Sequence, residues 1–248
     1  MIHIFTSVVN RPDFIPLQQK LFDKFLKNEY KFHIVDDSVD SKITEEFKLV
    51  CNANGLEYYR KPPTNKPLNP AQACADTVQW TYDNIIRKNH SEDIVFFLDS
   101  DMFLIDEFDI EEYMSDALIG GLPQIRGHVT YMWNGIMFFN MPMLEDKNID
   151  FSDGVVEGEM TDVGGSTYWY FLRTGVKMKE SDVDYPTHYN DIDLQKDAGG
   201  YNMELHLDGK FLHYRAATNW HSNWKGSDDP LMGKTKVFKQ IMESILSE

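Results

Sequence analysis

The sequence predicts an α/β protein, and three features support this prediction. Short apolar runs alternate with helical patterns through the first 100 residues, which is typical of parallel strands joined by helices. The run Ile94–Leu98 is apolar without a break, as expected of a strand that is buried on both faces of a sheet. After Asp101 the pattern becomes mixed α+β, and no linker divides the chain. We therefore expect one domain, 1–248, with a first half at 1–101 and a second at 102–248.

The expected elements of the first half follow from local patterns. Strands are expected at Ile2–Phe5, Phe32–Val35, Leu56–Tyr59 and Ile94–Leu98. One helix is expected after Pro12, because Phe14, Leu17, Leu21 and Phe25 recur every three or four positions. Two more helices are expected, at Ser41–Asn54 with Gly55 as its stop and at Ala71–Lys88.

The second half is expected to mix strands and helices without regular alternation. Strands are expected at Leu118–Leu122, Tyr131–Asn140, Met203–Leu207 and Lys210–Tyr214, and helices at Asp162–Thr174 and Leu231–Leu246. The pair Asp208-Gly209 lies between two of these strands, and this dipeptide favours a two-residue hairpin turn.

Composition restricts the class of partner. The chain carries 24 Lys and Arg against 40 Asp and Glu, a formal charge of −16. Nucleic-acid binding requires basic patches, so we expect no nucleic-acid partner, although an anionic small ligand is possible if a cation lies between. The two cysteines, Cys51 and Cys74, form no CxxC pair and are interpreted as buried thiols in a reducing compartment. No apolar run is long enough for a transmembrane segment and no signal-peptide pattern is found, so we expect a soluble cytoplasmic protein.

Two carboxylates directly follow the strongest strand. Asp99 and Asp101 stand two residues apart after Ile94–Leu98, so an extended backbone points both side chains to one side. Ligands of open α/β sheets bind at the carboxyl ends of strands. Two carboxylates aimed at one point repel each other unless a cation lies between them, and oxygen ligands suit Mg²⁺ or Mn²⁺. The alternative interpretation is a solvated turn after a strand.

Four segments with recognisable residue patterns follow one another along the chain. They are Ile34-Val35-Asp36-Asp37-Ser38, Leu98-Asp99-Ser100-Asp101, the strand Asn134–Asn140, and His213-Tyr214 followed by Trp220 and Lys225. In this order they resemble the VDDxS stretch, the D-x-D motif, the N-(S/A)-G-hydrophobic-N strand and the late H-x…K segment of nucleotide-sugar-dependent glycosyltransferases with the A-type fold. The resemblance implies a Rossmann-like nucleotide-binding half with a mixed sheet and an acceptor-binding second half.

The resemblance also implies an activity and a metal site. A hexosyltransferase of this kind moves a sugar from a nucleoside diphosphate sugar, with UDP the first expectation, to a carbohydrate or other hydroxyl acceptor. It uses Mn²⁺ or Mg²⁺. In this sequence Asp101 would bind the metal directly, Asp99 would lie near the ribose and the metal, and His213 would be the third ligand. His221 is the rival ligand, and His213 could instead be a satisfied core histidine.

Further residues are implied for the donor. Thr6 and Ser7 would form the loop that meets the nucleotide, and Asp36 or Asp37 would accept a hydrogen bond from the base or ribose. Ser100 is included with the donor site because it lies inside the D-x-D motif. Lys225 would contact the diphosphate. Asp36-Asp37 also has a plainer interpretation, since acidic residues are favoured before a helix N-terminus.

Acceptor binding and catalysis are implied for the second half. Asp162 would face the acceptor or the reactive carbon of the sugar, although it could be a plain helix N-cap. Asp153, Glu157 and Glu159 are acidic alternatives just upstream. Asn134, Trp220 and Trp224 are expected at the acceptor, the two tryptophans because their loop is polar.

Other protein classes share parts of this pattern. A haloacid-dehalogenase-type phosphatase also has D-x-D after a buried strand, but usually on the first strand, whereas 98 residues precede it here. A sugar nucleotidyltransferase would need a glycine-rich loop after the first strand, and residues 6–12 contain no glycine. A domain that binds a nucleotide or carbohydrate without turnover stays an alternative.

Overall fold

The computed structural model describes residues 1–64, 69–189, 192–193, 203–215 and 230–247. These residues form two compact units that interleave along the chain. Unit 1 comprises Met1–Pro16, Lys27–Ser100 and Asp109–Ser181, and unit 2 comprises Leu17–Leu26, Asp101–Phe108 and the described part of Asp182–Glu248. Among the described helices, none is long and apolar enough to cross a membrane. The description of the chain as a single domain stays a prediction.

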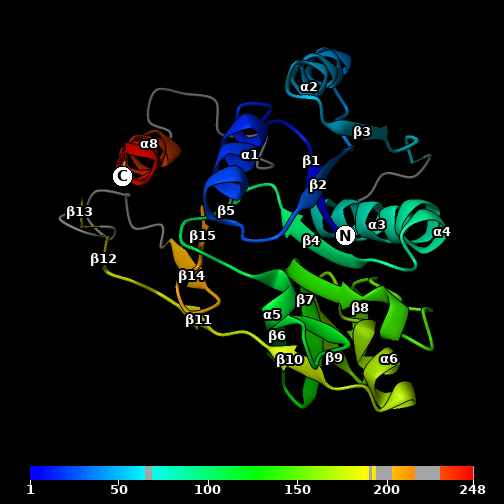
Figure 1. Ribbon diagram of the computed structural model, residues 1–248. Helices are drawn as coiled ribbons and strands as arrows, with labels where there is room; N and C mark the ends of the chain where they lie inside the picture. The colour runs from blue at the N-terminus through cyan, green and yellow to red at the C-terminus, as the bar shows by residue number, and fades with distance from the viewer. Residues whose placement is uncertain (65–68, 190–191, 194–202, 216–229, 248) are drawn as a thin grey trace. The chain divides into compact units, whose positions relative to one another are not determined.

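Unit 1 is built on a seven-stranded mixed sheet, labelled in Figure 1. Its strands, in spatial order, are β10 (Met178–Glu180), β6 (Ile119–Arg126), β7 (Val129–Asn140), β4 (Ile94–Asp99), β1 (Ile2–Val8), β2 (Tyr30–Asp36) and β3 (Glu57–Arg60). The four strands from β4 to β3 are parallel, whereas β7 runs antiparallel to both β4 and β6. The predicted α/β fold with a mixed sheet is confirmed.

The helices of the first half lie where the sequence predicts them. α1 is Phe14–Phe25, and α2 is Ser41–Asn54. Asp40 caps the N-terminus of α2 by accepting from the Lys42 amide, and Gly55 ends the helix with a φ of 65°. The third predicted helix is one helical stretch in three parts, α3 (Pro70–Thr81), a π-helical segment (Tyr82–Ile86) and α4 (Arg87–Asn89).

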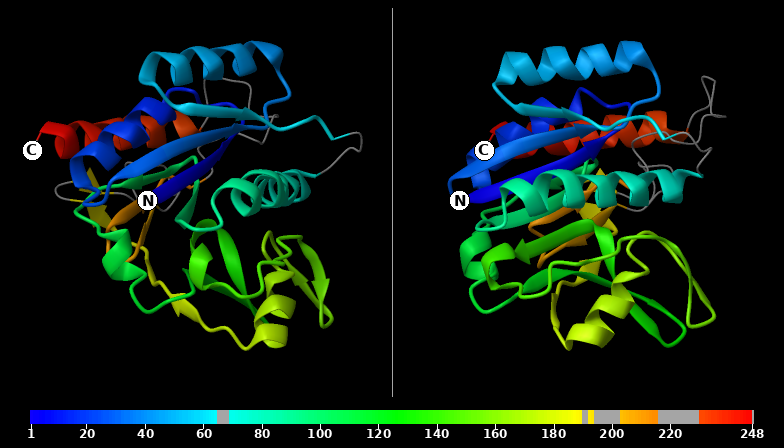
Figure 2. Two further views of the ribbon diagram at one scale, coloured as in Figure 1. Left: turned by 45° about the vertical axis from the view of Figure 1, so that its right-hand side comes forward. Right: turned by 90° about the vertical axis from the view of Figure 1, so that its right-hand side faces the viewer.

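The core of unit 1 lies between the sheet and this helical stretch. Val78 of α3 and Tyr82 and Ile85 of the π-helical segment are buried in one cluster with Phe5 of β1 and Phe97 of β4. Two views in Figure 2 show α3 running alongside the strands. The parallel strands β4, β1, β2 and β3 end at the same edge of the sheet, so the polar residues that follow them lie along this carboxyl edge.

The remaining elements of unit 1 are short. They are α5 (Ile110–Tyr113), a 3₁₀ turn (Met141–Met143), β8 (Gly154–Val156), β9 (Glu159–Thr161) and α6 (Thr167–Thr174). The prediction that the last helix begins at Asp162 is wrong, because it begins at Thr167. Gly164 has a φ of 90°, which a right-handed helix does not allow, and a Cβ atom there would lie 2.0 Å from the carbonyl oxygen of Met132.

Unit 2 contains a four-stranded antiparallel sheet. Its order is β11 (Val183–Asp184), β14 (Glu204–His206), β15 (Phe211–His213) and β5 (Met102–Leu104). The predicted hairpin between β14 and β15 is confirmed, and Asp208 and Gly209 have φ values of 53° and 80° at its turn. Unit 2 also contains β12 (His188–Tyr189), β13 (Ile192–Asp193) and α8 (Pro230–Ser247). In α8, Phe238 lies 4.7 Å from Phe103 and stacks 4.5 Å from Tyr214, between ring centroids.

Candidate functional site

The carboxyl edge of the unit 1 sheet brings together several residues that the sequence predicts at the donor site. Ser7 of β1 lies opposite Asp99 of β4 on one side and Val35 of β2 on the other, and Asp36 follows at the next position. The hydroxyl oxygens of Thr6 and Ser7 are buried and have no hydrogen-bond partner among the described residues. Two buried hydroxyls whose hydrogen bonds are unmade therefore lie near this edge, and a buried carboxylate lies on the adjacent strand.

Asp36 is held by its own surroundings. Its side chain is fully buried, and it accepts hydrogen bonds from the Ser38 amide at 2.7 Å and the Tyr58 hydroxyl at 2.6 Å. The Arg60 guanidinium lies 3.1 Å from its Oδ1 atom. Burial and the hydrogen bond to Asp36 raise the pKa of Tyr58, so this hydroxyl stays a donor at neutral pH. Asp36 thus anchors β3 and the turn after β2.

Asp37 forms an ion pair with Lys61, a nearly buried residue that sequence reasoning missed. The Lys61 ammonium is 3.2 Å from Asp37 and 2.7 Å from Asp76, and the Lys61 residue is only 3% exposed. The Thr77 hydroxyl of α3 donates to the other oxygen of Asp37 at 2.6 Å. A signal was available, since Lys61 directly follows the strand that pairs with β2, whose end is Asp36. The Lys61 ammonium therefore pairs with two carboxylates in a nearly buried place.

The thiol of Cys74 is affected by the charges of three carboxylates of unit 1. Burial raises the pKa of its thiol well above the usual range, and the charges of Asp99, Asp162 and Asp37 raise it further. The side-chain amide of Asn134 donates to its sulfur at 3.2 Å. Asp99 and Asp162 therefore lie in one electrostatic neighbourhood. Asn134, predicted to meet the acceptor, has a buried side chain directed at this thiol.

Asp162 is exposed and is not a helix cap. The residue that precedes α6 is Ser166, so the alternative interpretation of Asp162 as a plain N-cap is wrong. Its backbone amide donates to the Tyr131 hydroxyl at 3.0 Å, and one of its carboxylate oxygens accepts from the Val163 amide at 2.8 Å. Both contacts fix the carboxylate in a loop outside regular structure, which is where catalytic side chains often lie.

In unit 2, Asp101 and His213 form a buried pair. The pairing of β15 with β5 places His213 opposite Met102, and the Tyr214 amide donates to the Asp101 carbonyl at 2.8 Å. The Nε2 atom of His213 then lies 3.5 Å from Oδ1 of Asp101. Both side chains are nearly inaccessible to solvent. Asp99 and Ser100 belong to unit 1, whereas Asp101 belongs to unit 2. The D-x-D motif is therefore divided between the two units.

Glu204 completes this arrangement, and sequence reasoning missed it. Its Oε2 atom lies 2.7 Å from Nδ1 of His213, directly across the β14–β15 ladder. The same oxygen is 3.5 Å from Nε2 of His206, and Oε1 is 3.2 Å from the Arg215 guanidinium. The signal was the Asp208-Gly209 turn, because a hairpin closed there places Glu204 opposite His213.

The charges of this group are strongly coupled. Burial alone would lower the pKa of His213, but the carboxylates of Asp101 and Glu204 outweigh it and raise the pKa to about 9. Burial would raise the pKa of Glu204, yet its contacts with His206, His213 and Arg215 hold it well below its usual range. Glu204 therefore stays ionised and fixes the orientation of the His213 ring.

These residues suit a divalent cation. The carboxylate of Asp101 faces Nε2 of His213, and both side chains are buried. The carboxylate of Glu204 binds the other ring nitrogen, Nδ1. Metal-binding histidines almost always donate their second N–H to such a partner. Carboxylate and imidazole ligands together are acceptable to Mn²⁺. Trp220, His221, Trp224 and Lys225 lie outside the described residues, so the predictions for them remain predictions.

Comparison with solved structures places the chain among known folds. Over 98% of this chain and 95% of the other, it is similar to the galactosyltransferase LgtC in complex with donor and acceptor sugar analogues, with a TM-score of 0.51 and 13% identity. It also matches the mannosyltransferase PcManGT from Pyrobaculum calidifontis in complex with GDP-Man and Mn²⁺, with a TM-score of 0.46 and 10% identity over 72% of this chain. The apo form of mouse xyloside xylosyltransferase 1 matches over 73% of this chain and 85% of its own, with a TM-score of 0.43 and 10% identity.

These likenesses are structural. The match spans 54% of PcManGT and 57% of an active-site mutant of LgtC. Neither a scan against protein-family models nor a search of curated proteins finds a match for the sequence. The likeness over nearly the full length of both chains shows that this protein has the A-type fold of nucleotide-sugar-dependent glycosyltransferases, as its sequence predicts.

Proposed function

We propose that the protein transfers a hexosyl group from a nucleoside diphosphate sugar, UDP-sugar first, to a hydroxyl acceptor such as a carbohydrate, with Mn²⁺ or Mg²⁺ as cofactor. The observation that supports this most is the buried group of Asp101, His213 and Glu204. Without a metal, the protonated ring of His213 pairs with the carboxylates of Asp101 and Glu204, and a divalent cation that replaces the proton on Nε2 would keep the negative charge of Asp101 paired. The fold is consistent with this proposal.

In this proposal Asp101 and Nε2 of His213 hold the cation. Glu204 would hold the proton on Nδ1 of His213, and the bound cation would displace to solvent the proton that Nε2 carries at neutral pH because of its raised pKa. The bound cation would neutralise the negative charge that develops on the departing diphosphate, which is the main requirement of this reaction. Asp99 is proposed to contact the ribose and a water of the metal, and Ser100, which stands between Asp99 and Asp101 in the sequence, is proposed to belong to the donor site.

The nucleotide is proposed to bind at the carboxyl edge of the unit 1 strands. Thr6 and Ser7 would offer their hydroxyls, whose hydrogen bonds are unmade. Of the two neighbouring acids, Asp37 is the better candidate for the base or ribose, because its side chain is 19% exposed whereas that of Asp36 is fully buried. Lys225 remains the proposed contact with the diphosphate.

Catalysis and acceptor binding are assigned to the second half. Asp162 is proposed to face the acceptor or the reactive carbon, because its carboxylate is exposed and shares an electrostatic neighbourhood with Asp99. A general base must lie within about 3 Å of the hydroxyl that it deprotonates. Trp220 and Trp224 are proposed to stack on the acceptor sugar, and Asn134 is proposed to contribute to acceptor binding.

The test is thermal denaturation with a panel of nucleoside diphosphates, each with and without Mn²⁺, followed by detection of nucleotide release from the matching sugar donor. We expect at least one nucleoside diphosphate to raise Tm only when Mn²⁺ is present. A ligand at 100 times its Kd stabilises a protein by about 2.7 kcal/mol, which is an easily measured shift. If no member of the panel raises Tm, the proposal fails. If a nucleoside diphosphate binds but no nucleotide is released from the sugar donor, the result would instead support the alternative that the protein binds nucleotides without catalysing transfer.

A further inference from the structure

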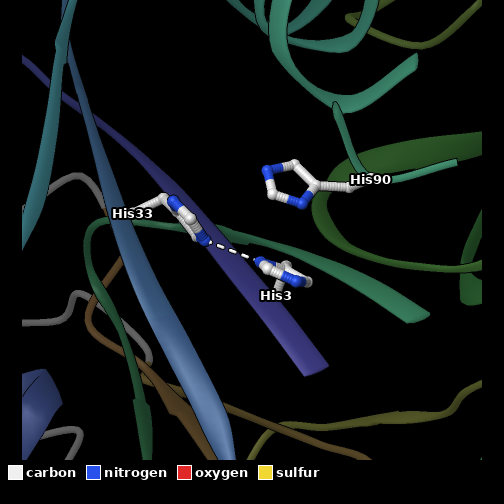
Figure 3. Close-up of side chains that lie close together, drawn as sticks. All are labelled: His3, His33 and His90. Carbon is white, nitrogen blue, oxygen red and sulfur yellow. Dashed lines mark hydrogen bonds between the residues drawn. The ribbon is translucent and has the colours of Figure 1, made fainter. Parts of the chain in front are cut away.

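Three histidine rings converge in unit 1, away from the carboxyl edge of the sheet. His3 comes from the start of β1, His33 from the middle of β2, and His90 from the residue after α4. Figure 3 shows the rings pointing toward one another. One ring nitrogen from each histidine lies within 4.8 Å of the other two, and Nδ1 of His3 is 2.9 Å from Nε2 of His33.

We propose that His3, His33 and His90 bind a zinc-class transition-metal ion at a site distinct from the Asp101 and His213 pair. Two nitrogen ligands on one tetrahedral Zn²⁺ lie about 3.3 Å apart, given Zn–N bonds of about 2.0–2.1 Å. The observed 2.9 Å between His3 and His33 needs only a small separation of the rings to admit the ion. Three histidines leave a fourth coordination position for water or another ligand.

The three rings are in the protonation state that a metal requires. Burial, with repulsion from His90 next, lowers the pKa of His3 to about 4. Burial, with repulsion from His3 next, lowers the pKa of His33 to about 3. Burial also lowers the pKa of His90. All three are therefore neutral at pH 7, so a metal ion does not have to displace a proton charge from the site.

Carboxylates stand behind the rings, as they do in protein zinc sites. Oδ2 of Asp93 lies 3.3 Å from Nε2 of His3 and 3.8 Å from Nδ1 of His90. Oε2 of Glu57 lies 3.9 Å from Nδ1 of His33. Such carboxylates fix the tautomer of a metal-binding histidine and increase its basicity.

The positions of the protons on the His3 and His33 rings also favour a metal site. Asp93 favours a proton on Nε2 of His3, so Nδ1 of His3 must accept, and His33 must donate to it through Nε2. That leaves Nδ1 of His33 unprotonated, and this buried atom has no hydrogen-bond partner among the described residues. A metal ion between Nδ1 of His3 and Nε2 of His33 would move the proton of His33 to Nδ1, which faces Glu57. In the metal-bound form the N–H of His3 would face Asp93 at 3.3 Å, and that of His33 would face Glu57, which at 3.9 Å must move closer to accept a hydrogen bond. The two rings would release no net proton.

The first experiment is a titration of the chelator-treated full chain with Co²⁺ alone, followed by visible absorption. Tetrahedral Co²⁺ with nitrogen ligands absorbs strongly, whereas six-coordinate Co²⁺ on oxygen ligands absorbs weakly. We expect one intense band, saturating at one equivalent and removed by Zn²⁺. His90→Gln should abolish this band, and it is the preferred variant because His90 is the least buried of the three. His128→Gln, at an exposed histidine, is the matched control and should keep it.

A second group in the described chain, Glu204, His206 and His213, also has metal-ligand spacing. His213→Gln separates the two possibilities, because it should leave the intense band unchanged. Loss of the band in His213→Gln with retention in His90→Gln would overturn the proposal, and so would a wild-type protein without the band.

Asp93→Asn tests the outer carboxylate while every ring is kept. We expect Zn²⁺ affinity to fall about 10- to 100-fold in calorimetric titration. A Zn²⁺ affinity equal to that of the wild type would contradict the proposed zinc site. No nucleotide is present in these experiments, so their outcome is independent of the proposed transferase activity.

Discussion

Glu204 and His213 face each other across the β14–β15 hairpin, with 2.7 Å between Oε2 of the acid and Nδ1 of the imidazole. The other ring nitrogen of His213 lies 3.5 Å from Asp101. The ring is thus held between two carboxylates before any ligand binds. Preorganisation of this kind reduces the cost of assembling a metal site.

Glu204→Gln should weaken Mn²⁺ binding in the presence of the nucleotide about 10- to 100-fold, because the amide no longer fixes the tautomer and basicity of His213. Calorimetric titration of Mn²⁺ measures this change. Glu243→Gln, at an exposed acid on α8, is the matched control in the same unit and should bind as wild type does. Equal affinities of the two variants would remove Glu204 from the metal site.

Asp101→Asn should weaken Mn²⁺-dependent nucleotide binding by at least ~100-fold, about 2.7 kcal/mol, because a direct anionic ligand is lost. Tm without metal should also fall, because the substitution removes a carboxylate that pairs with the buried, protonated ring of His213. His213→Ala should act in the same direction but less, because water can replace a neutral ligand, and Asp99→Asn should fall between them.

Asp116→Asn is the control for Asp101→Asn, because Asp116 is a surface acid whose side chain is 84% exposed. Its nucleotide affinity should equal that of the wild type. Wild-type affinity in Asp101→Asn would exclude Asp101 as a ligand, and unchanged binding in His213→Ala would point to His221 or to solvent.

Asp162→Asn should lower kcat by about 10²- to 10⁴-fold while the Kd of the nucleotide stays the same, if this carboxylate acts on the acceptor proton. The fold should persist, because an amide oxygen can still accept from the Val163 amide. Steady-state kinetics and calorimetry separate the two effects. Asp153→Asn is the comparison, and a large loss there with none in Asp162→Asn would transfer the role to Asp153.

Gly164→Ala should destabilise the protein more than Gly158→Ala. Both glycines have a positive φ, 90° and 86°, so both variants carry backbone strain of about 1–3 kcal/mol. Only at Gly164 would the new Cβ atom meet the backbone, 2.0 Å from the Met132 carbonyl, whereas nothing lies within 4 Å at Gly158. Urea denaturation gives the two free energies of unfolding, and equal values would show that the loop after β9 can shift freely.

Stability should fall as pH drops from about 6.5 toward 4 in the presence of a chelator. His3 and His33 take up protons in the unfolded chain near pH 6.5 but in the folded protein only near pH 4 and pH 3. The unfolded state therefore binds more protons in this window, and the slope approaches ~2.7 kcal/mol per pH unit for two such groups.

The groups that face these two rings are known. His90, Asp93, Lys31 and the N-terminal ammonium act on His3, and His90, Lys31 and Glu57 lie close to His33. Urea denaturation at several pH values measures the slope. His33→Gln should make it shallower by about one proton, and an unchanged slope would show that His33 does not contribute.

The sequence is informative where a signal is local. Helix α2 has the predicted bounds because Gly55 supplies the left-handed residue that ends it, and the acidic pair follows an apolar strand that is recognisable by itself. The start of α6 was wrong because a glycine with positive φ interrupts a pattern that otherwise looks helical. Glu204 and Lys61 were missed because their partners come from other segments of the chain.

The histidine cluster shows the same limit more clearly. His3, His33 and His90 are separated by 30 and 57 positions, and each lies in a different segment of the chain. Only the packing of β1, β2 and the end of α4 brings them together. No spacing rule along the chain describes such a group, because its geometry comes from the parallel sheet.

The placement of Asp101 beside His213 depends on the main chain. β15 pairs with β5 so that His213 lies opposite Met102, and the Tyr214 amide binds the Asp101 carbonyl. Any amino acid except proline can supply these hydrogen bonds, so neighbouring positions tolerate substitution more readily than they tolerate changes in length. One residue inserted into the Leu207–Lys210 turn would shift the β14–β15 register and turn side chains to the opposite face of the sheet. The pair formed by Glu204 and His213 is thus vulnerable to an insertion that alters neither residue.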